Sequence, residues 1–385
     1  MSLSRGKSRR PEKSRFDLGF ATAEGTSKFK NRFLEKLASG HFREAQGLWF
    51  SSVGAGSYLG EPDERTDLLY KEGLQEAIRG GVNVIDSAIN YRCQRSERSF
   101  GKAIREMIEA GEVTREELII CTKGGFLPFD NTYPRDPSQY FSETFIETGL
   151  LTPKEIVQGC HAMSPGFLEN QLERSLENFG LETLDIYYVH NPETQLAEVN
   201  RKEFMERLQA TFEILEKKVS EGKIRMYGTA TWSGYRTSPE NSEYLSLEEV
   251  AILAREVGGA NHHFRVVQLP LNLGMPEAWV VANQDYGAQK VSFLEAARKL
   301  GIVVMASASL LQGQLARPFP PDFQRLFPHF KKSSQCSLQF VRSCPGVVTA
   351  LVGMKTGAHV IENLETAKAE PFSERELTQL FQKTS

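Results

Sequence analysis

Eight short apolar segments recur along the chain, and segments with a helical period separate them. The apolar segments are rich in Val, Ile and aromatic residues and show little polar alternation, which is typical of parallel strands covered on both faces. Strands that alternate with helices imply right-handed crossovers and therefore a parallel sheet. The eight predicted strands are Gly47–Val53, Val82–Asp86, Leu118–Lys123, Leu184–His190, Ile224–Ala230, Phe264–Leu269, Ile302–Ala306 and Val347–Val352.

Between these strands, apolar residues recur every four positions, as along one face of a helix. Phe100, Ile104 and Ile108 show this spacing, and the last predicted helix covers Ala358–Lys368. The α/β pattern predicts a closed (β/α)8 TIM barrel in a single domain, a fold of about 250 residues plus insertions. An open doubly wound sheet is the alternative, but it normally stops at about six strands.

Two segments fall outside the repeat. Residues 1–45 precede the first predicted strand and are expected to form an N-terminal extension, partly disordered, so that the barrel covers residues 46–385. Residues 124–164 form a long insertion after the third strand and are rich in aromatic residues, which disordered linkers lack. Because the insertion leaves the C-terminal end of a strand, we expect it to lie over the active-site face. The alternative is a folded excursion on the side of the barrel.

The charge balance and the cysteines limit the class of protein. The chain has 385 residues and a net charge of -3, without the basic face that nucleic-acid binding requires. No apolar run is long enough to span a membrane, and the basic first residues lack the apolar core of an export signal. Five cysteines without zinc spacing favour free thiols in a reducing compartment. We therefore expect a cytoplasmic protein with no metal, nucleic-acid or membrane partner, and its oligomeric state stays open.

Ionisable residues end three consecutive strands. Asp86, Lys123 and His190 close the second, third and fourth predicted strands, and Tyr91 follows Asp86 by five residues. In a barrel these strand ends converge on one face, where a buried Asp and Lys need each other as partners. A lysine ammonium stabilises a nearby phenolate and lowers the pKa of the phenol, and a histidine orients a carbonyl oxygen. The four residues therefore predict a proton-transfer site.

Several segments of the chain resemble the signatures of the aldo-keto reductase superfamily. Asp86–Tyr91 with Gly101–Ile104 is similar to the first signature, and Glu169–Pro192 is similar to the second. The resemblance spans roughly residues 47–368, with its motifs in the family's order. It implies a (β/α)8 barrel that binds a nicotinamide dinucleotide and reduces an aldehyde or ketone by hydride transfer.

Carried over to this chain, the resemblance makes Tyr91 the proton donor, assisted by Asp86, Lys123 and His190. It also implies a set of cofactor-binding residues and places Tyr58 and Trp232 at the substrate. Ala230-Thr231 stands where the family commonly has Ser-Asn, and Ser307 stands where it often has a stacking tyrosine. The cofactor-binding set is Gly56, Ser57, Ala230, Thr231, Gln268, Ser307, Leu310, Gln312, Gly313, Gly353, Lys355, Thr356, His359, Glu362 and Asn363.

The last strand–helix loop bears on the choice of cofactor. His359 takes the place of an arginine that is frequent in the family, and Lys355 offers a point charge for a 2′-phosphate. We therefore expect NADP, with NAD possible, and a small-molecule carbonyl substrate. The segment Gly54–Gly60 only superficially matches a Rossmann dinucleotide fingerprint, because its third glycine is one position late.

Two other functions are compatible with these residues. A non-catalytic barrel of the same fold would bind the cofactor and sense the redox state, and the altered nicotinamide contacts favour that alternative. A lyase or isomerase would use Lys123 as a Schiff-base nucleophile. The tetrad of Asp86, Tyr91, Lys123 and His190 favours the reductase over both.

Overall fold

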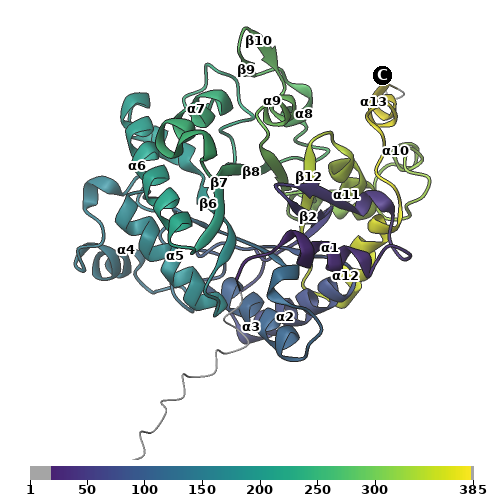
Figure 1. The fold of residues 1–385 in the computed structure, drawn as a ribbon, viewed down its shortest axis with the longest axis horizontal. Helices are drawn as coiled ribbons and strands as arrows, with labels where there is room; N and C mark the ends of the chain where they lie inside the picture. The colour runs from purple at the N-terminus through teal and green to yellow at the C-terminus, as the bar shows by residue number, and fades with distance from the viewer. Residues whose placement is uncertain (1–18, 383–385) are drawn as a thin grey trace, which may run out of the picture.

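The computed structural model describes residues 19–382 of the chain. A closed parallel barrel forms its centre, with the strand order β11-β12-β3-β4-β5-β6-β7-β8. Eight helices surround the barrel, one after each of its strands, as Figure 1 shows in a view down the molecule. The predicted (β/α)8 fold is therefore confirmed. The barrel strands are β3 (Val53–Gly56), β4 (Val84–Asp86), β5 (Ile119–Gly124), β6 (Leu184–His190), β7 (Ile224–Ala230), β8 (Phe264–Pro270), β11 (Val303–Ser307) and β12 (Val347–Gly353).

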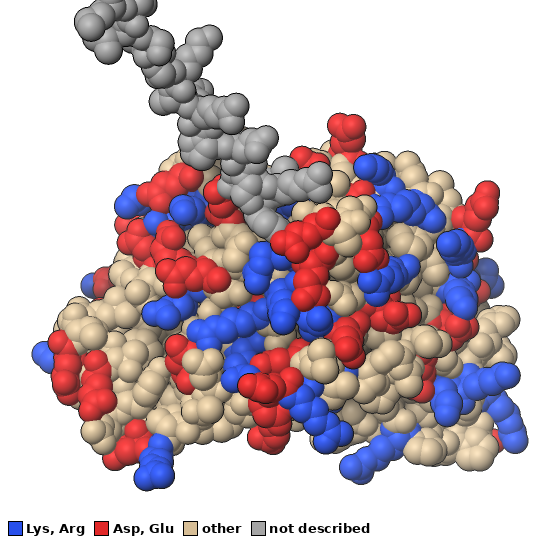
Figure 2. Space-filling model, turned by 90° about the horizontal axis from the view of Figure 1, so that it is seen from below, with Lys and Arg blue, Asp and Glu red and all other residues tan. Residues whose placement is uncertain are grey.

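The surrounding helices pack their apolar faces on the outer surface of the strands and form the larger of the two main hydrophobic clusters. Figure 2 shows the face below the view of Figure 1, where basic and acidic residues are interspersed. None of the helices among residues 19–382 is long and apolar enough to cross a membrane. The surrounding helices are α2 (Glu64–Arg79), α3 (Arg95–Glu109), α5 (Pro165–Phe179), α6 (Arg201–Ser220), α7 (Leu247–Gly258), α9 (Phe293–Lys299), α11 (Ser333–Ser343) and α12 (Gly357–Leu364).

Several shorter helices and two hairpins lie outside the barrel and its surrounding helices. The last predicted helix divides into α12 and a 3-10 turn, Glu365–Lys368, because the helix tightens at its end. The remaining helices are α1 (Ala23–Asn31), α4 (Pro137–Phe141), α8 (Glu277–Val280), α10 (Pro321–Gln324) and α13 (Glu374–Gln382). Two antiparallel hairpins lie outside the barrel, β1 (Phe42–Ala45) with β2 (Leu48–Ser51), and β9 (Gln284–Tyr286) with β10 (Gln289–Val291).

The first barrel strand lies later in the chain than the sequence predicts. The predicted strand Gly47–Val53 divides between β2 of the first hairpin and the start of β3, which runs from Val53 to Gly56. The composition of β3 hides it, because the strand contains two glycines. A Cβ at Gly54 would lie 2.7 Å from a methyl group of Thr349, so the close packing of β3 on β12 requires a glycine.

The first hairpin and α1 cover the N-terminal end of the barrel. Leu48 and Phe50 of β2 are fully buried and pack with the residues that fill the barrel interior, including Tyr188 and Met305. The expected boundary between extension and barrel, at residues 45 and 46, therefore falls inside this hairpin. Residues 1–18, part of the predicted disordered extension, lie outside the described residues.

The insertion at residues 124–164 follows β5 and contains α4 and a single π-helical turn, Ser142–Ile146. Most of it forms a separate hydrophobic cluster, in which Phe145 contacts Phe167 of α5 at 5.8 Å between ring centroids. Figure 1 accordingly shows α4 at the outer edge of the barrel, beyond α5. The first residues of the insertion lie closer to the barrel, since the Phe126 ring contacts His190 at the end of β6.

Candidate active site

The register of the barrel brings the predicted site residues to one level at the C-terminal end. Gly56 of β3 pairs with Gly353 of β12 on one side and with Asp86 of β4 on the other. Across the barrel, Ala230 of β7 pairs with His190 of β6 and with Gln268 of β8. Alternate residues of a strand face the interior, so the side chains of Asp86, His190 and Gln268 enter the same space.

An ion pair between Lys123 and Asp86 forms the centre of the site. The Lys123 ammonium lies 2.6 Å from a carboxylate oxygen of Asp86 and also donates to the carbonyl of Ser87 at 2.7 Å. The other Asp86 oxygen accepts a hydrogen bond of 2.8 Å from the Gln268 amide. Burial lowers the pKa of Lys123, but the charge of Asp86, the nearby Tyr91 and the hydrogen bond to Asp86 together outweigh burial and leave that pKa above its ordinary value. Lys123 is therefore a fixed, protonated cation at neutral pH.

Tyr91 lies over this cation. Its ring centroid is 5.0 Å from the Lys123 nitrogen, 4.9 Å from the Tyr58 ring centroid and 5.9 Å from that of His190. Burial raises the pKa of the Tyr91 phenol, and the Lys123 ammonium lowers it by a smaller amount. Lys123 thus acts in the direction expected from the sequence, but the net pKa is raised because burial dominates.

His190 is the other polar group beside Tyr91. Burial and the nearby Lys123 charge hold the pKa of His190 well below its usual range, so that the imidazole is neutral at pH 7. Its Nδ1 atom is buried and has no hydrogen-bond partner among the described residues. A neutral imidazole carries one N–H donor, and it can therefore orient a carbonyl oxygen without protonating it.

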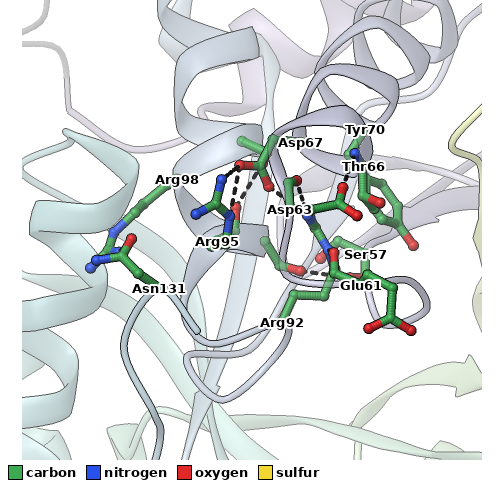
Figure 3. Close-up of polar contacts among 12 residues, drawn as sticks. Ser57, Glu61, Asp63, Thr66, Asp67, Tyr70, Arg92, Arg95, Arg98 and Asn131 are labelled. Atoms are coloured by element: carbon green, nitrogen blue, oxygen red, sulfur yellow. Dashed lines mark hydrogen bonds and ion pairs between the residues drawn. The ribbon is translucent and has the colours of Figure 1, made fainter. Parts of the chain in front are cut away.

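A buried arginine ties the Tyr91 loop to the first strand–helix loop. The guanidinium of Arg92 donates to the carbonyl of Glu61 at 3.0 Å and to the carboxylate of Asp67 at 2.5 Å. Asp67 also accepts from Arg95, and Figure 3 shows its carboxylate between the two arginines. Because this network joins α2, α3 and both loops, it holds the backbone next to Tyr91 in place.

The backbone that follows Tyr91 is strained. Arg92, Cys93 and Gln94 have φ values of 49°, 54° and 67°, in the left-handed region that side chains other than glycine rarely adopt. Three consecutive residues in this region turn the chain sharply from Tyr91 into α3. Such strain persists only where the surrounding contacts determine the conformation, and the Arg92 network supplies these contacts.

Two predicted cofactor residues, Ser57 directly after β3 and Gln268 on β8, form hydrogen bonds with other residues of the protein. The hydroxyl of Ser57 is 2.9 Å from that of Ser87, and the side chain of Ser57 is fully buried. Gln268, predicted to bind the cofactor, donates its amide hydrogen to Asp86. Gln268 therefore belongs to the hydrogen-bonded network of the tetrad in this structure.

The loop after β7 retains a free polar group. Thr231 is buried, and its hydroxyl has no hydrogen-bond partner among the described residues. The loop is held by Glu193, whose carboxylate accepts from the backbone N–H groups of Trp232, Ser233 and Gly234. A buried hydroxyl without a partner costs free energy unless a ligand engages it. Thr231 therefore fits a cofactor carboxamide, and Trp232 is 43% exposed beside it.

The remaining predicted cofactor residues lie at the ends of β11 and β12, in the loops that follow these strands, and on α12. Ser307 and Leu310 are half-buried, and Gln312 and Gly313 are exposed with left-handed backbones. Thr356 caps the N-terminus of α12 through the backbone of the exposed His359. In α12, the Glu362 carboxylate accepts from Ser334 of α11, and Asn363 is buried. These loops surround a strand end and a helix N-terminus, where a phosphate group binds readily.

Lys355 lies between the last and the first strand–helix loops. Its nitrogen is 3.5 Å from the position that a Cβ at Gly60 would take, and it has no ion-pair partner among the described residues. No group of three or more His, Cys, Asp or Glu residues within 19–382 has the arrangement of a metal site.

Phe126 belongs to the aromatic insertion that is expected over the active-site face, whereas four other residues around the site were not predicted from the sequence, namely Arg92, His161, Glu193 and Gln195. They lie outside the motifs, and their roles depend on contacts between segments distant in the chain. Only the position of Arg92, next to Tyr91, offered a signal in the sequence.

The comparisons with known proteins agree with this geometry. The model of the aldo/keto reductase family matches residues 52–325. The chain belongs to the aldo/keto reductase family. NADH-specific methylglyoxal reductase from Escherichia coli is 26% identical over 212 residues, which cover 55% of this chain and 53% of that protein. A putative voltage-gated potassium channel subunit beta from Schizosaccharomyces pombe is 28% identical over 207 residues, 53% of this chain and 48% of that one.

Prostaglandin F synthase 1 from Bos taurus is 26% identical over 157 residues, 41% of this chain and 34% of that protein. The matches thus span about a third to a half of these relatives. Among solved structures, an aldo/keto reductase from Klebsiella pneumoniae in complex with NADP and acetate has a TM-score of 0.59 and 19% identity, covering 90% of this chain and 95% of its own. This family member therefore shares the fold over nearly its whole length.

Proposed function

We propose that this protein is an NADPH-dependent reductase that converts an aldehyde or ketone into an alcohol. The observation that carries the proposal is the buried Lys123–Asp86 pair beneath Tyr91, with the neutral His190 on the other side of the phenol. The structure with NADP from Klebsiella pneumoniae and the methylglyoxal reductase from Escherichia coli support a nicotinamide cofactor. A cytoplasmic location stays a prediction.

In this mechanism, His190 donates a hydrogen bond to the substrate carbonyl oxygen and places it next to the Tyr91 hydroxyl. Tyr91 then transfers its proton to that oxygen as negative charge develops there. Lys123 stabilises the phenolate that remains, and Asp86 keeps Lys123 charged and in position. A bound nicotinamide dinucleotide would supply the hydride that reduces the carbonyl carbon.

The residues of this chain that would hold the cofactor are divided between two regions. Thr231 would bind the carboxamide, since its buried hydroxyl lacks a partner among the described residues. Lys355 and the N-terminus of α12 would bind the phosphate of the adenosine end. Because Gln268 and Ser57 already have partners in the protein, their expected contacts with the cofactor are secondary to their role in holding Asp86 and Ser87.

The decisive experiment is a screen of NADPH oxidation over a panel of aldehydes, ketones, quinones and sugars. Replacing Tyr91 by phenylalanine keeps the ring and its contacts but removes the proton. We expect kcat to fall about 10²–10⁴-fold, while the dissociation constant of NADPH, measured by fluorescence titration, changes less than threefold. Carbonyl reduction that survives Tyr91→Phe within a factor of ten would refute the assignment of the proton donor.

A second candidate is a cofactor-binding regulator that does not turn over substrate. The similarity to a putative potassium channel subunit beta and the raised pKa of Tyr91 favour this alternative. Such a protein would bind NADPH with the same affinity in the wild type and in Tyr91→Phe, and it would oxidise NADPH with none of the carbonyls in the panel.

A further inference from the structure

His190, a member of the proposed tetrad, is connected to a buried histidine that lies outside the tetrad. His161, near the end of the insertion, is fully buried, and its Nε2 atom lies 2.7 Å from the carbonyl oxygen of His190. Its other ring nitrogen, Nδ1, lies 2.8 Å from the amide nitrogen of Gln195. Gln195 belongs to the 3-10 turn Pro192–Ala197 that directly follows β6. Both partners of His161 therefore come from the segment that carries His190.

The hydrogen bonds around Gln195 determine which nitrogen of His161 carries the proton. Arg207 of α6 donates to the amide oxygen of Gln195 at 2.5 Å, and Glu203 holds Arg207 with an ion pair of 2.6 Å. An arginine only donates, so the amide oxygen of Gln195 must face Arg207 and the amide nitrogen must face His161. The amide then donates to Nδ1, which leaves the single proton of the neutral ring on Nε2, where it is donated to His190.

The backbone beside this contact leaves no room for another side chain. Gly125 has a φ of 143°, and a Cβ there would lie 2.8 Å from the His190 carbonyl oxygen and 2.9 Å from the Nε2 atom of His161. Gly125 also accepts a backbone hydrogen bond of 2.9 Å from Ala162. The two ends of the insertion thus close around the His161–His190 hydrogen bond.

The Phe126 ring also contacts the imidazole rings of both histidines. Its centroid is 5.1 Å from that of His161 and 5.0 Å from that of His190, with interplanar angles of 84° and 87°. Edge-to-face contacts of this kind favour one relative orientation of the rings. The imidazole plane of His190 is therefore set by Phe126, which in turn packs on His161.

We propose that His161 is a positioning residue, which through its hydrogen bond to the His190 carbonyl and its contact with Phe126 fixes the imidazole that orients the substrate. This rests on the proposed reductase activity. The series of hydrogen bonds from Glu203 through Arg207 and Gln195 sets the tautomer of His161. Through His161, the insertion is bonded to the backbone of His190. Misplacement of a reacting group by about 1 Å costs about a hundredfold in rate, so a modest rotation of His190 is sufficient to slow turnover.

The test compares His161→Leu with His161→Gln. Leucine removes both hydrogen bonds, whereas a glutamine amide retains one donor for the His190 carbonyl and one acceptor for Gln195. We expect kcat/KM for the carbonyl to fall about tenfold to a hundredfold in His161→Leu and to recover to within about threefold of the wild type in His161→Gln. The NADPH dissociation constant should stay within twofold in both. Equal losses in both variants, or a loss below twofold in His161→Leu, would overturn the proposal.

A spectroscopic measurement makes the proposal independent of turnover and of the folding of His161→Leu. In ¹⁵N-detected spectra of the imidazoles, the wild type should show His161 as a neutral Nε2–H tautomer from pH 6 to 8. Gln195→Leu should give a mixture of tautomers and shift the ring signals of His190, whereas Gln209→Leu, an exposed substitution on α6, should not. An Nδ1–H tautomer in the wild type, or unchanged His190 signals in Gln195→Leu, would refute the positioning role. Absence of carbonyl reduction in the wild type would refute only the reductase.

Discussion

Two buried ion pairs lie at opposite ends of the barrel and differ in what surrounds them. At the N-terminal end, Arg115 contacts Asp185 at 2.9 Å, and at the C-terminal end Lys123 contacts Asp86 at 2.6 Å. The side chains of all four residues are at most 6% exposed. Burial and distance therefore do not distinguish a structural pair from the pair that we propose to take part in catalysis.

The difference lies in the groups that complete each pair. The Asp185 carboxylate accepts hydrogen bonds from the backbone N–H groups of Ala21 and Ile120, and Arg115 donates to backbone carbonyls. The Arg115–Asp185 pair, at the lower end, therefore holds neighbouring backbone segments together. The upper pair is completed by the Gln268 side chain and the Ser87 carbonyl, and its Lys123 nitrogen lies 5.0 Å from the centroid of the half-buried Tyr91 ring. A buried ion pair that borders an ionisable ring is the better candidate for a catalytic role.

The largest effect is expected at the upper pair. Lys123→Met removes the charge that stabilises the Tyr91 phenolate, and we expect kcat to fall about 10²–10⁴-fold, measured with NADPH and the best carbonyl of the panel. The double variant Asp86→Asn/Lys123→Met should regain stability toward urea without regaining activity, because it removes the unpaired buried carboxylate. Turnover of Lys123→Met within tenfold of the wild type would contradict the role of this pair.

The lower pair should affect stability alone. Asp185→Ala leaves Arg115 buried without a counter-charge, and we expect the free energy of unfolding to fall by about 3–5 kcal/mol, measured by urea denaturation. The kcat of the protein that remains folded should change less than twofold. As a control, Arg115→Met/Asp185→Leu should recover most of the lost stability. A selective loss of kcat in Asp185→Ala would show that the two ends of the barrel are not independent.

The pH dependence of stability involves a histidine at each end. Burial lowers the pKa of His41, beside the N-terminal hairpin, to about 3 and that of His161 to about 4. In the unfolded chain these imidazoles bind protons below a pKa of about 6.5, whereas in the folded protein they stay neutral. Their contribution to the free energy of unfolding is therefore fully present above pH 6.5 and is lost as the pH decreases toward 4. We expect each of these two rings to contribute a loss of about 1 kcal/mol between pH 6.5 and 5.5 in urea titrations, and His190 and His262, whose pKa values burial also lowers, to add to that loss.

His41→Gln should reduce this loss by about 1 kcal/mol per pH unit, which is the share of one buried ring among the several that titrate only on unfolding. A slope that stays unchanged in His41→Gln would assign the pH dependence to other groups.

The smallest effect concerns a cation at the upper end that has no counter-charge among the described residues. Lys355→Met should raise the NADPH dissociation constant about fivefold, which corresponds to about 1 kcal/mol, and leave that of NADH unchanged. Fluorescence titration with both cofactors measures this difference. Equal changes for NADPH and NADH would place the 2′-phosphate elsewhere.

The strand pattern predicted the barrel because parallel strands covered on both faces are continuously apolar, and β6 and β7 have the predicted limits. The strand β3 escaped detection because its two glycines, of which Gly54 is required by close packing, carry no hydrophobic signal. The proposed tetrad could be predicted because Asp86, Lys123 and His190 lie at the ends of neighbouring strands, with Tyr91 five residues after Asp86. The hydrogen bonds that fix the site, from Gln195 to His161 and from Gln268 to Asp86, join residues 34 and 182 positions apart, which no local spacing encodes.

The hairpin of β1 and β2 closes the barrel from below, and Tyr188 and Met305 fill the interior above it. Among residues 19–382 the N-terminal end of the barrel is therefore closed, and the cofactor and the substrate of the proposed reductase would both enter at the C-terminal end. Because the cofactor and the substrate would enter from the same end, the one that binds deeper would bind first and leave last. For the proposed reductase we therefore expect an ordered sequence of binding and release, which would appear as competitive product inhibition by one ligand only.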